Sequence, residues 1–296
     1  MVQVLYNPLS NNGKGGEAVE KLTPLFPDKK VSFSDITKID GMKNFISGLD
    51  KDDKLIITGG DGTVNHFIND LDGECPERDI FYYPMGSGND FFNDIKEKAK
   101  NGFVRLNEYL KDLPVITVKG RSSFFLNGIG YGIDGYCCEE GDRQRARSSK
   151  KINYTAIALK GLLFFYHPTN AAITVDGKEY KFGRVFLAPT MNGRFFGGGM
   201  MIAPEQDRLN KERTVTVSVA HDTNKFNILR VFPSIFKGAH VKYKKIFASF
   251  VGKDITVKFD RPTALQIDGE TVTGVSEYSV KAGKLMKERE KPPLLV

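Results

Sequence analysis

The sequence predicts two domains, an α/β domain followed by an antiparallel β-sandwich. Three observations support this division. Strand-like and helix-like segments alternate over residues 1–115, short strands dominate residues 116–284, and the length of 296 residues suits two domains of about 100–200 residues each. The remaining tail, 285–296, is charged and then Pro-rich, and its expected place is against the first domain.

The first domain should contain a parallel sheet. Strands that alternate with helices form parallel sheets with helices on both faces. The apolar spacing within residues 62–71 is that of an amphipathic helix. The expected strands are Val2–Tyr6, Val31–Phe33, Lys54–Thr58 and Ile80–Tyr83, and the expected helices are Glu17–Leu25, Met42–Leu49, Gly62–Leu71 and one that begins at Asn89.

The second domain should be an antiparallel sandwich with one or two helices. The dipeptide Asp176-Gly177 lies between two strand-like runs, which is a strong signal for a β-hairpin. Helices are expected at Ile152–Phe165 and Phe226–Phe236. The expected strands are Val115–Val118, Ser123–Leu126, Ala171–Val175, Tyr180–Leu187, Thr214–Ala220, Ile255–Phe259, Leu265–Ile267 and Tyr278–Lys281.

The composition is that of an ordinary globular protein. Hydrophobic residues make up 40% of the chain and charged residues 27%, which excludes wholesale disorder. The cysteines Cys75, Cys137 and Cys138 form no CxxC pair, so neither a disulfide framework nor a zinc site is expected, and a reducing compartment is favoured. The net charge of +7 suits nucleotides, an anionic membrane or nucleic acid, but no nucleic-acid-binding motif is present.

The expected location is the cytoplasm, with peripheral contact at a membrane. The N-terminus has no signal-type apolar run, and no stretch approaches the roughly 20 apolar residues of a spanning helix. Two basic stretches could contact an anionic surface or could be solvated faces. The first comprises Arg143, Arg145, Arg147, Lys150 and Lys151; the second, the better membrane candidate, comprises Lys237, Lys242, Lys244 and Lys245 interleaved with Phe236, Tyr243 and Phe247.

The strongest motif is Thr58-Gly59-Gly60-Asp61-Gly62-Thr63, between a buried strand and a helix. Glycines allow the backbone to approach phosphate oxygens, and a helix start offers unpaired amides and a positive dipole end. Asp61 adds a carboxylate where a magnesium–nucleotide complex would lie. The loop lacks the terminal Gly-Lys-Ser/Thr of the Walker pattern.

Two further loops follow strands and precede helices. They are Asn7–Gly16 and Pro84–Asp90. Loops at the carboxyl ends of parallel strands line one crevice, so the three loops should form a single anion-binding cleft. Lys14 could neutralise phosphate charge. The simpler interpretation of Asn89 or Asp90 is a helix N-cap.

These three loops resemble the motif series of the diacylglycerol kinase catalytic domain. That family includes sphingosine and ceramide kinases and bacterial soluble lipid kinases. Three later segments resemble the family's downstream motifs in the same order, namely Asn127–Asp134, Phe196–Pro204 and Ile267–Glu270. The resemblance spans nearly the whole chain, and the length fits the bacterial soluble members best.

The resemblance implies a Rossmann-like first domain, with loops like those of phosphofructokinases and NAD kinases, and a β-sandwich second domain. It further implies ATP and Mg²⁺ as cofactors, ATP binding between the domains, and a lipid hydroxyl such as that of diacylglycerol as acceptor. Carried over residue by residue, the nucleotide contacts are Asn7, Pro8, Leu9, Ser10, Asn11, Ser34, Gly59, Gly60, Asp61, Gly62, Thr63, Val64, Asn65, Ser87, Asn89 and Asp90.

The resemblance also assigns catalytic carboxylates, namely Asp61, Asp268 and Glu270. Phosphoryl transfer to a hydroxyl requires a group that takes the hydroxyl proton and a metal that offsets phosphate charge. Asp268 and Glu270 are both candidates for the base. Taken alone, Asp268-Gly269-Glu270 reads as a hairpin turn with an exposed glutamate.

A structural network is expected around Asp134. It resembles a family aspartate that pairs with a lysine and an asparagine. Lys14 and Asn89 are the candidate partners, and Asn127 belongs to the same expected network.

The chain departs from the family pattern at a metal motif. Bacterial relatives carry Asp-x-x-Asp-Gly, which holds a structural magnesium, whereas this chain has Asp207, Asn210 and Lys211. An amide oxygen binds Mg²⁺ more weakly than a carboxylate, and a lysine opposes the cation. The expected metal site at Asp207 and Asn210 is therefore weakened.

Two other functions are compatible with these motifs. A catalytically impaired regulator would bind nucleotide or lipid without turnover. An NAD kinase-like enzyme would share the Gly-Gly-Asp-Gly-Thr loop and use an Asn-Glu pair, here Asn107-Glu108, in a segment that looks helical. The resemblance allows a homodimer, and it leaves the identity of the lipid open.

Overall fold

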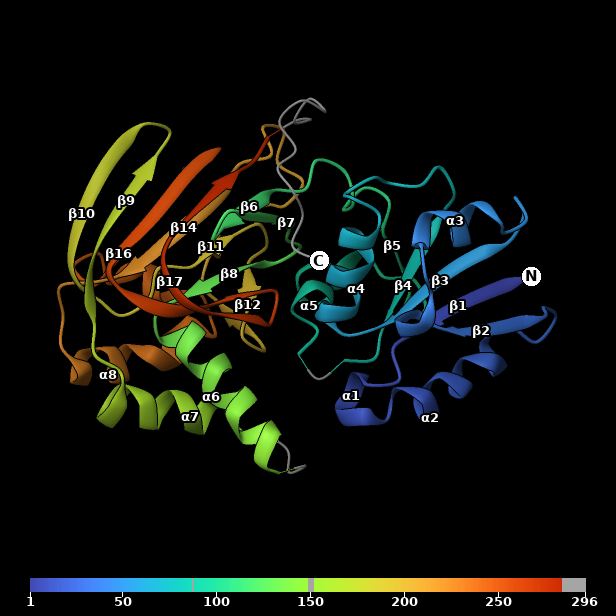
Figure 1. Cartoon of the computed structure of the whole chain (residues 1–296), viewed down its shortest axis with the longest axis horizontal. Coiled ribbons are helices and arrows are strands. Elements are labelled where there is room, and N and C mark those ends of the chain that lie inside the picture. The colour runs from blue at the N-terminus through green and yellow to red at the C-terminus, as the bar shows by residue number, and fades with distance from the viewer. Residues whose placement is uncertain (87, 149–151, 284–296) are drawn as a thin grey trace. The chain divides into compact units, whose positions relative to one another are not determined.

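The computed structural model describes residues 1–86, 88–148 and 152–283, and the chain divides into two compact units between Leu113 and Pro114 (Figure 1). The predicted nucleotide contact at Ser87, the basic residues Lys150 and Lys151, and the tail 285–296 lie outside the described residues. The side chain of Asn11 also lies outside them.

The first unit is built on a five-stranded sheet in the order β2-β1-β3-β4-β5. Strands β1 to β4 pair in parallel, which confirms the predicted α/β fold. The final strand, which the sequence did not reveal, pairs antiparallel with β4. The bounds are β1 Val2–Tyr6, β2 Val31–Asp35, β3 Lys54–Gly59, β4 Ile80–Pro84 and β5 Val104–Arg105.

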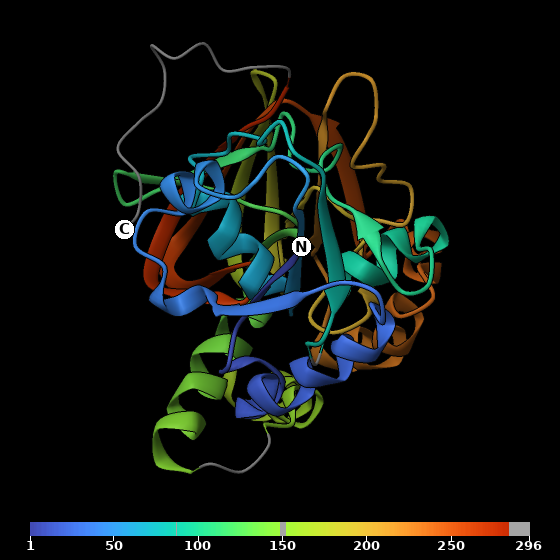
Figure 2. The same cartoon turned by 90° about the vertical axis from the view of Figure 1, so that its right-hand side faces the viewer.

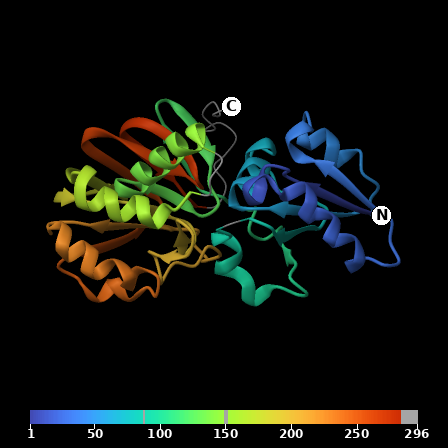
Figure 3. The same ribbon diagram turned by 90° about the horizontal axis from the view of Figure 1, so that it is seen from below.

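Helices lie on both faces of this sheet (Figures 2 and 3). The helix expected over Glu17–Leu25 is interrupted, because Pro24 lacks a backbone N–H and a 3₁₀ helix replaces the second half. The helix-like segment at 104–110 is instead β5 and turns. The helical bounds are α1 Ser10–Gly13, α2 Gly15–Val19, η1 Glu20–Leu25, η2 Ile36–Lys38, α3 Met42–Ser47, α4 Asp61–Asp70, α5 Asp90–Ile95 and η3 Lys96–Lys98.

The second unit contains a ten-stranded sheet in the order β15-β14-β11-β8-β16-β17-β6-β7, with β9 and β10 joined to it through β16. Its pairs are antiparallel, as expected for the sandwich. The strands are β6 Val115–Val118, β7 Arg121–Phe124, β8 Gly128–Tyr131, β9 Thr169–Val175, β10 Lys178–Val185, β11 Thr190–Met191, β12 Phe195–Phe196, β13 Met200–Met201, β14 Val215–Ala220, β15 Phe247–Gly252, β16 Asp254–Ile267 and β17 Glu270–Lys281.

Strand β16 joins two strands that the sequence predicted separately. The segments Ile255–Phe259 and Leu265–Ile267 are both parts of it. The register with β17 is irregular between Lys258 and Leu265. Pro262 lies in this irregular stretch, where a missing N–H donor is tolerated. One bent strand therefore pairs with β9 at its start and with β8 at its end.

Helices cover part of the second unit, and the first of them was missed. Helix α6 has few apolar residues, and its buried positions include Asp134, Gly135 and Gly141, so no apolar period marks it in the sequence. A Cβ atom on Gly135 would overlap the carbonyl of Ala264, so glycine lets α6 approach β16 closely. The helical bounds are α6 Ile133–Arg147, α7 Tyr154–Lys160, π-helical η4 Gly161–Phe165, α8 Lys225–Ile235 and η5 Ala239–Lys242.

Within the described residues, no helix combines the length and the apolar character that crossing a bilayer demands. The predicted hairpin at Asp176-Gly177 is confirmed, with both residues at positive φ between β9 and β10. A second two-residue turn, Asp268-Gly269, joins β16 to β17 in the same way.

Candidate active site

Three sequence-predicted loops meet at one edge of the first unit's sheet. The parallel register places Tyr6 opposite Thr58 and Thr58 opposite Tyr83. The loops that follow β1, β3 and β4 therefore leave the sheet side by side, at the edge where ligands of open α/β sheets bind.

Glycines let two of these loops pack backbone to backbone. A Cβ atom on Gly86 would overlap the Cα of Gly60, and the Met85 N–H donates a 2.8 Å hydrogen bond to the carbonyl of Gly59. On Gly59, a Cβ atom would overlap the side chain of Thr63. The glycines at 59, 60 and 86 thus set the shape of the two loops.

Asp61 connects the same two loops through its carboxylate. One oxygen accepts the N–H of Asp90 and the other the N–H of Phe91, both at 2.9 Å. The carboxylate therefore caps α5, which has no cap from its own Asn89. Asp61 is half-buried, and because a carboxylate has about four acceptor sites, these two bonds leave capacity for a metal ion.

Asn89 shapes the loop that contains it. Its side-chain oxygen accepts the N–H of Gly86 at 3.0 Å, and its amide donates to the Gly86 carbonyl at 2.8 Å. Its backbone is left-handed, with φ of 51°. The Asn89 side chain is therefore occupied in closing its own loop.

The loop after β1 folds into a compact turn. The Asn7 side chain accepts the N–H of Leu9 at 2.9 Å, and the Ser10 hydroxyl donates to the Asn7 carbonyl at 2.7 Å. A Cβ atom on Gly15 would overlap that carbonyl, so glycine allows α2 to start there. Lys14 lies exposed beside it.

Several predicted nucleotide contacts have side chains that face the protein. Val64 is fully buried, so only its backbone can contact a ligand. The Asn65 side-chain oxygen accepts a bond from Asn69. The Ser34 hydroxyl accepts a 3.0 Å bond from Gln3 on the neighbouring strand.

In the second unit, Asp268 is an anchor for another segment. Its buried carboxylate accepts the backbone N–H groups of Leu126, Asn127 and Gly128, the last two at 2.8 and 2.9 Å. Three amide donors stabilise the charged form of a carboxylate strongly. Asp268 therefore holds the segment between β7 and β8 against the β16–β17 turn.

Glu270, two residues later, is exposed. It begins β17 directly after the turn formed by Asp268 and Gly269, whose φ values are 46° and 100°. The anchored aspartate thus fixes the turn, and the glutamate extends from it towards solvent.

Asp134 is buried at the start of α6 and contacts Gln266. The Gln266 amide donates to the Asp134 carboxylate at 2.8 Å, and the Gln266 oxygen accepts the N–H of Gly269 at 2.6 Å. Burial raises the pKa of Asp134 to about 6, while the bond from Gln266 opposes that rise. The expected partners Lys14 and Asn89 belong to the first unit, so their pairing with Asp134 stays a prediction.

Sequence reasoning missed Gln266. The signal available in the sequence was one polar residue between two apolar residues, Leu265 and Ile267. The structure shows that all three are buried. A buried amide in an apolar strand has hydrogen-bond partners in most proteins.

Asn127 takes part in a polar network that the sequence revealed only in part. The buried Arg208 donates to the carbonyl of Leu126 at 3.1 Å and to the side-chain oxygen of Asn127 at 3.2 Å. Asn192 donates to the same Leu126 carbonyl at 2.9 Å. Arg208 and Asn192 were not predicted, and they hold the carbonyl side of the segment that Asp268 holds by its amides.

The stretch that follows Gln206 does not fit a structural magnesium. The Asn210 side-chain oxygen accepts the N–H and the hydroxyl of Thr214 at 3.0 and 3.2 Å, and its amide donates to the Asp207 carbonyl at 2.6 Å. Asp207 itself accepts the N–H of Leu209. Within the described ranges, no group of three or more His, Cys, Asp or Glu side chains could hold a metal ion.

Asn107, the candidate for an NAD kinase-like pair, completes the edge of β4. Its side-chain oxygen accepts the N–H of Ile80 at 2.9 Å and its amide donates to the Arg78 carbonyl at 2.8 Å. The residue is buried. The hydrogen-bonding groups of the Asn107 side chain are therefore used by backbone groups of the protein itself.

Two family matches cover both units. Residues 1–111 match the family described as the diacylglycerol kinase catalytic domain, and residues 127–284 match the YegS C-terminal NAD kinase beta sandwich-like domain. The chain belongs to the diacylglycerol kinase catalytic-domain family. Both the resemblance drawn from the motifs and the predicted fold class are confirmed.

The names of individual relatives agree with this family assignment. A Mycobacterium tuberculosis protein named "Diacylglycerol kinase" is 25% identical over 256 residues, covering 83% of this chain and 81% of its own. "Putative lipid kinase YtlR" of Bacillus subtilis is 25% identical over 233 residues, covering 73% and 74%. At the level of the family, the chain is a lipid kinase.

The fold has a solved counterpart. A structure titled as a putative diacylglycerol kinase from Bacillus anthracis superposes with a TM-score of 0.65 at 19% identity, covering 96% of this chain and 92% of the other. At that identity the likeness concerns the fold.

Proposed function

We propose that this chain is an ATP- and Mg²⁺-dependent kinase that transfers the γ-phosphate of ATP to the hydroxyl of a lipid such as diacylglycerol. The observation that carries the proposal is the packing of Gly60 against Gly86 at the carboxyl edge of the sheet. Two backbone segments that lie so close together at the end of a strand can present their amides to phosphate oxygens without interference from side chains.

The first unit would bind the nucleotide. Helix α4 begins at Asp61, and its N-cap residue is Gly60, which has no side chain to cap it, so the first amides and the dipole of the helix favour an anion. We assign Asp61 to the metal as well as to the α5 cap. Bound Mg²⁺ supplies charge neutralisation at the phosphates. The other predicted nucleotide contacts of the three loops, with Ser34, stay proposals.

We assign the base to Glu270. A base must reach the acceptor hydroxyl, and Glu270 is exposed whereas the Asp268 carboxylate is buried under three backbone amides. In the proposed step, Glu270 takes the hydroxyl proton as the lipid oxygen bonds to the γ-phosphorus. The bond from that phosphorus to the β–γ bridging oxygen breaks, and ADP leaves.

The lipid acceptor implies contact with a bilayer. We propose that the protein is cytoplasmic and peripheral, with residues 1–115 as nucleotide domain and 116–284 as lipid domain. A homodimer is compatible with these roles.

The test is label transfer from [γ-³²P]ATP with Mg²⁺ to mixed micelles that contain diacylglycerol, a sphingoid base, ceramide or phosphatidylglycerol. We expect one extractable product, which is lost in Glu270→Gln and kept in Glu277→Gln, an exposed glutamate of the same strand. ATP binding without label in any lipid would favour a regulator. Label in NAD would favour the small-molecule kinase.

A further inference from the structure

Three phenylalanines of the second unit are strongly exposed. The exposed fractions are 67% for Phe164, 64% for Phe165 and 80% for Phe226. Scattered apolar residues are normal on a protein surface, but a contiguous group marks an interaction site. We call these three residues the aromatic tip.

The tip residues come from two segments that pack together. The Lys225 ammonium donates a 3.1 Å hydrogen bond to the carbonyl of Leu163, which ties the first turn of α8 to η4. Beneath them, Ile157 and Leu162 share one buried cluster with Ile228 and other residues of α8. Phe226 therefore neighbours Lys225 on one segment, and Phe164 neighbours Leu163 on the other.

The same segments carry only positive formal charge. Residues 152–168 and 223–252 contain no Asp or Glu. Their seven Lys and Arg residues are Lys160, Lys225, Arg230, Lys237, Lys242, Lys244 and Lys245. None of the seven has an ion pair among the described residues, whereas Lys181, Lys253, Lys258 and Lys281 of the same unit each have one.

Helix α8 presents Phe226 and Arg230 on the side away from the core. Both residues are exposed and lie four positions apart, on one face of the helix, and the exposed Lys237 follows two residues after the helix ends. The opposite face buries Ile228, Val231 and Ile235. The eleven residues of α8 span about 16 Å, and the lysines of 237–245 follow the end of the helix that is opposite Phe226.

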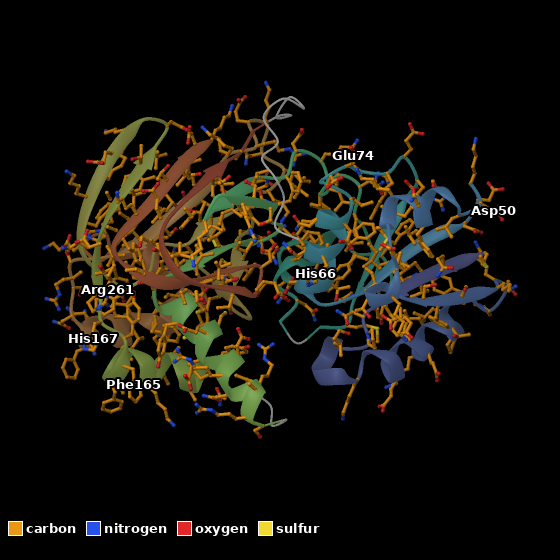
Figure 4. The ribbon with its side chains drawn as sticks, viewed as in Figure 1. Asp50, His66, Glu74, Phe165, His167 and Arg261 are labelled. Atoms are coloured by element: carbon orange, nitrogen blue, oxygen red, sulfur yellow. The ribbon has the colours of Figure 1, made fainter. Side chains whose placement is uncertain are left out.

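A further cation, Arg261, lies next to the tip. Phe165 lines a cavity of about 340 Å³ together with His167 and Arg261 (Figure 4), and Glu139 contributes the acidic group at its wall. Of the aromatic residues predicted for the basic patch, Phe236 and Tyr243 are each 41% exposed. Phe247 is buried, so its place in that patch was wrong.

We propose that the surface formed by the aromatic tip and the seven cations of the same two segments docks the protein on an anionic lipid bilayer. The inference rests on the proposed lipid kinase function. Aromatic rings favour the boundary between headgroups and acyl chains, and unpaired lysines are attracted to anionic headgroups. The absence of acidic residues from both segments is the charge complementarity that selects an anionic surface.

Vesicle flotation of the full chain tests the proposal, without ATP. We expect binding to vesicles of phosphatidylcholine with phosphatidylglycerol, little binding to phosphatidylcholine alone, and weakening by salt. Lys244→Gln with Lys245→Gln should weaken binding about fivefold for each lysine. Phe164→Ser with Phe226→Ser should weaken it by about tenfold for each ring.

Matched controls come from the same unit. Lys178→Gln with Lys181→Gln on β10, and Val251→Ser on β15, where Val251 is 61% exposed, should leave vesicle binding unchanged. Equal loss in tip and control variants, equal binding to neutral vesicles, or preference for single-stranded nucleic acid over vesicles would each overturn the proposal.

A second readout separates this inference from the proposed function. Phosphorylation of a short-chain diacylglycerol below its micellar concentration needs no bilayer, so tip variants should retain it. Vesicle binding that depends on the tip, in a protein with no kinase activity, would reject the function and keep the docking surface. Kinase activity in a protein whose vesicle binding does not depend on the tip would support the proposed function and reject the docking surface.

Discussion

Gln266 bridges Asp134 to the Asp268-Gly269 turn, with its amide 2.8 Å from the Asp134 carboxylate and its oxygen 2.6 Å from the Gly269 nitrogen. One side chain thereby joins the first turn of α6 to the hairpin that carries Glu270. Asp134, Gln266 and Asp268 are buried, whereas Gly269 and Glu270 are exposed. The position of the proposed base therefore depends on a buried amide.

Replacement of Gln266 by methionine should lower the free energy of unfolding by about 1–3 kcal/mol, because Asp134 and Gly269 both lose a buried partner. Urea denaturation measures the loss. The same substitution in an Asp134→Ala background should cost less, because one of the two partners is already gone. Additive losses in the double variant would contradict the bridge.

Asp134 should make the stability depend on pH between about 4 and 6. Its folded pKa of about 6 exceeds the ordinary 3.8, so the folded state holds the proton more tightly across that window. Stability from this group is then highest below pH 4 and falls by up to about 3 kcal/mol as the pH rises through 6. Asp134→Asn removes the titration.

The measurement is the difference in free energy of unfolding between Asp134→Asn and the wild type at pH 4 and at pH 7. The variant should gain stability relative to the wild type as the pH rises. A difference that stays constant with pH would show that Asp134 titrates normally in the folded protein.

Asp268→Asn should destabilise the protein by about 2–4 kcal/mol. The asparagine keeps one acceptor oxygen for three backbone donors, and its NH₂ group would face an N–H. The control is Asp176→Asn at the other Asp-Gly turn, where the carboxylate is exposed and accepts two N–H groups. Thermal unfolding should show a clearly smaller loss in the control; equal losses would contradict the anchoring role.

Glu270→Gln should lower the reaction rate and leave the stability unchanged, in contrast to Asp268→Asn, which should lower the stability. Loss of a general base typically costs about 10²–10⁴ in rate, whereas an exposed glutamate contributes little to stability. We expect kcat to fall by at least about a hundredfold with an unchanged midpoint of thermal unfolding. A full-rate Glu270→Gln enzyme would return the base assignment to Asp268.

Gly86→Ala should abolish ATP binding and lower stability, since the added Cβ would overlap the Cα of Gly60 and backbone cannot move aside cheaply. Calorimetric titration with Mg-ATP measures the first effect. Gly48→Ala is the control, because its Cβ would make only ordinary contacts at 3.5 Å or more. ATP binding at wild-type affinity in Gly86→Ala would contradict the proposed site.

Much of the first unit was predictable because its signals are local. The four parallel strands were apolar runs separated by helical segments, and the glycine-rich loops lay at their ends. Helix α6 was not predictable, because its buried face carries Asp134, Gly135 and Gly141 in place of apolar side chains. Strand β16 was split in two because Pro262 interrupts its pattern.

The sequence by itself determined the family, the order of the motifs and the set of candidate carboxylates. Each motif is a short run of residues, and the chemistry of the motif restricts which residue types can occur in it. Only the tertiary structure decided which of these carboxylates is buried and which is exposed. The family resemblance left Asp268 and Glu270 as equal candidates for the base, yet the partner of Asp268 at Leu126 lies 142 residues earlier in the chain. Folding brings those amides to the turn, so burial and hydrogen bonding occupy one carboxylate and leave the other exposed.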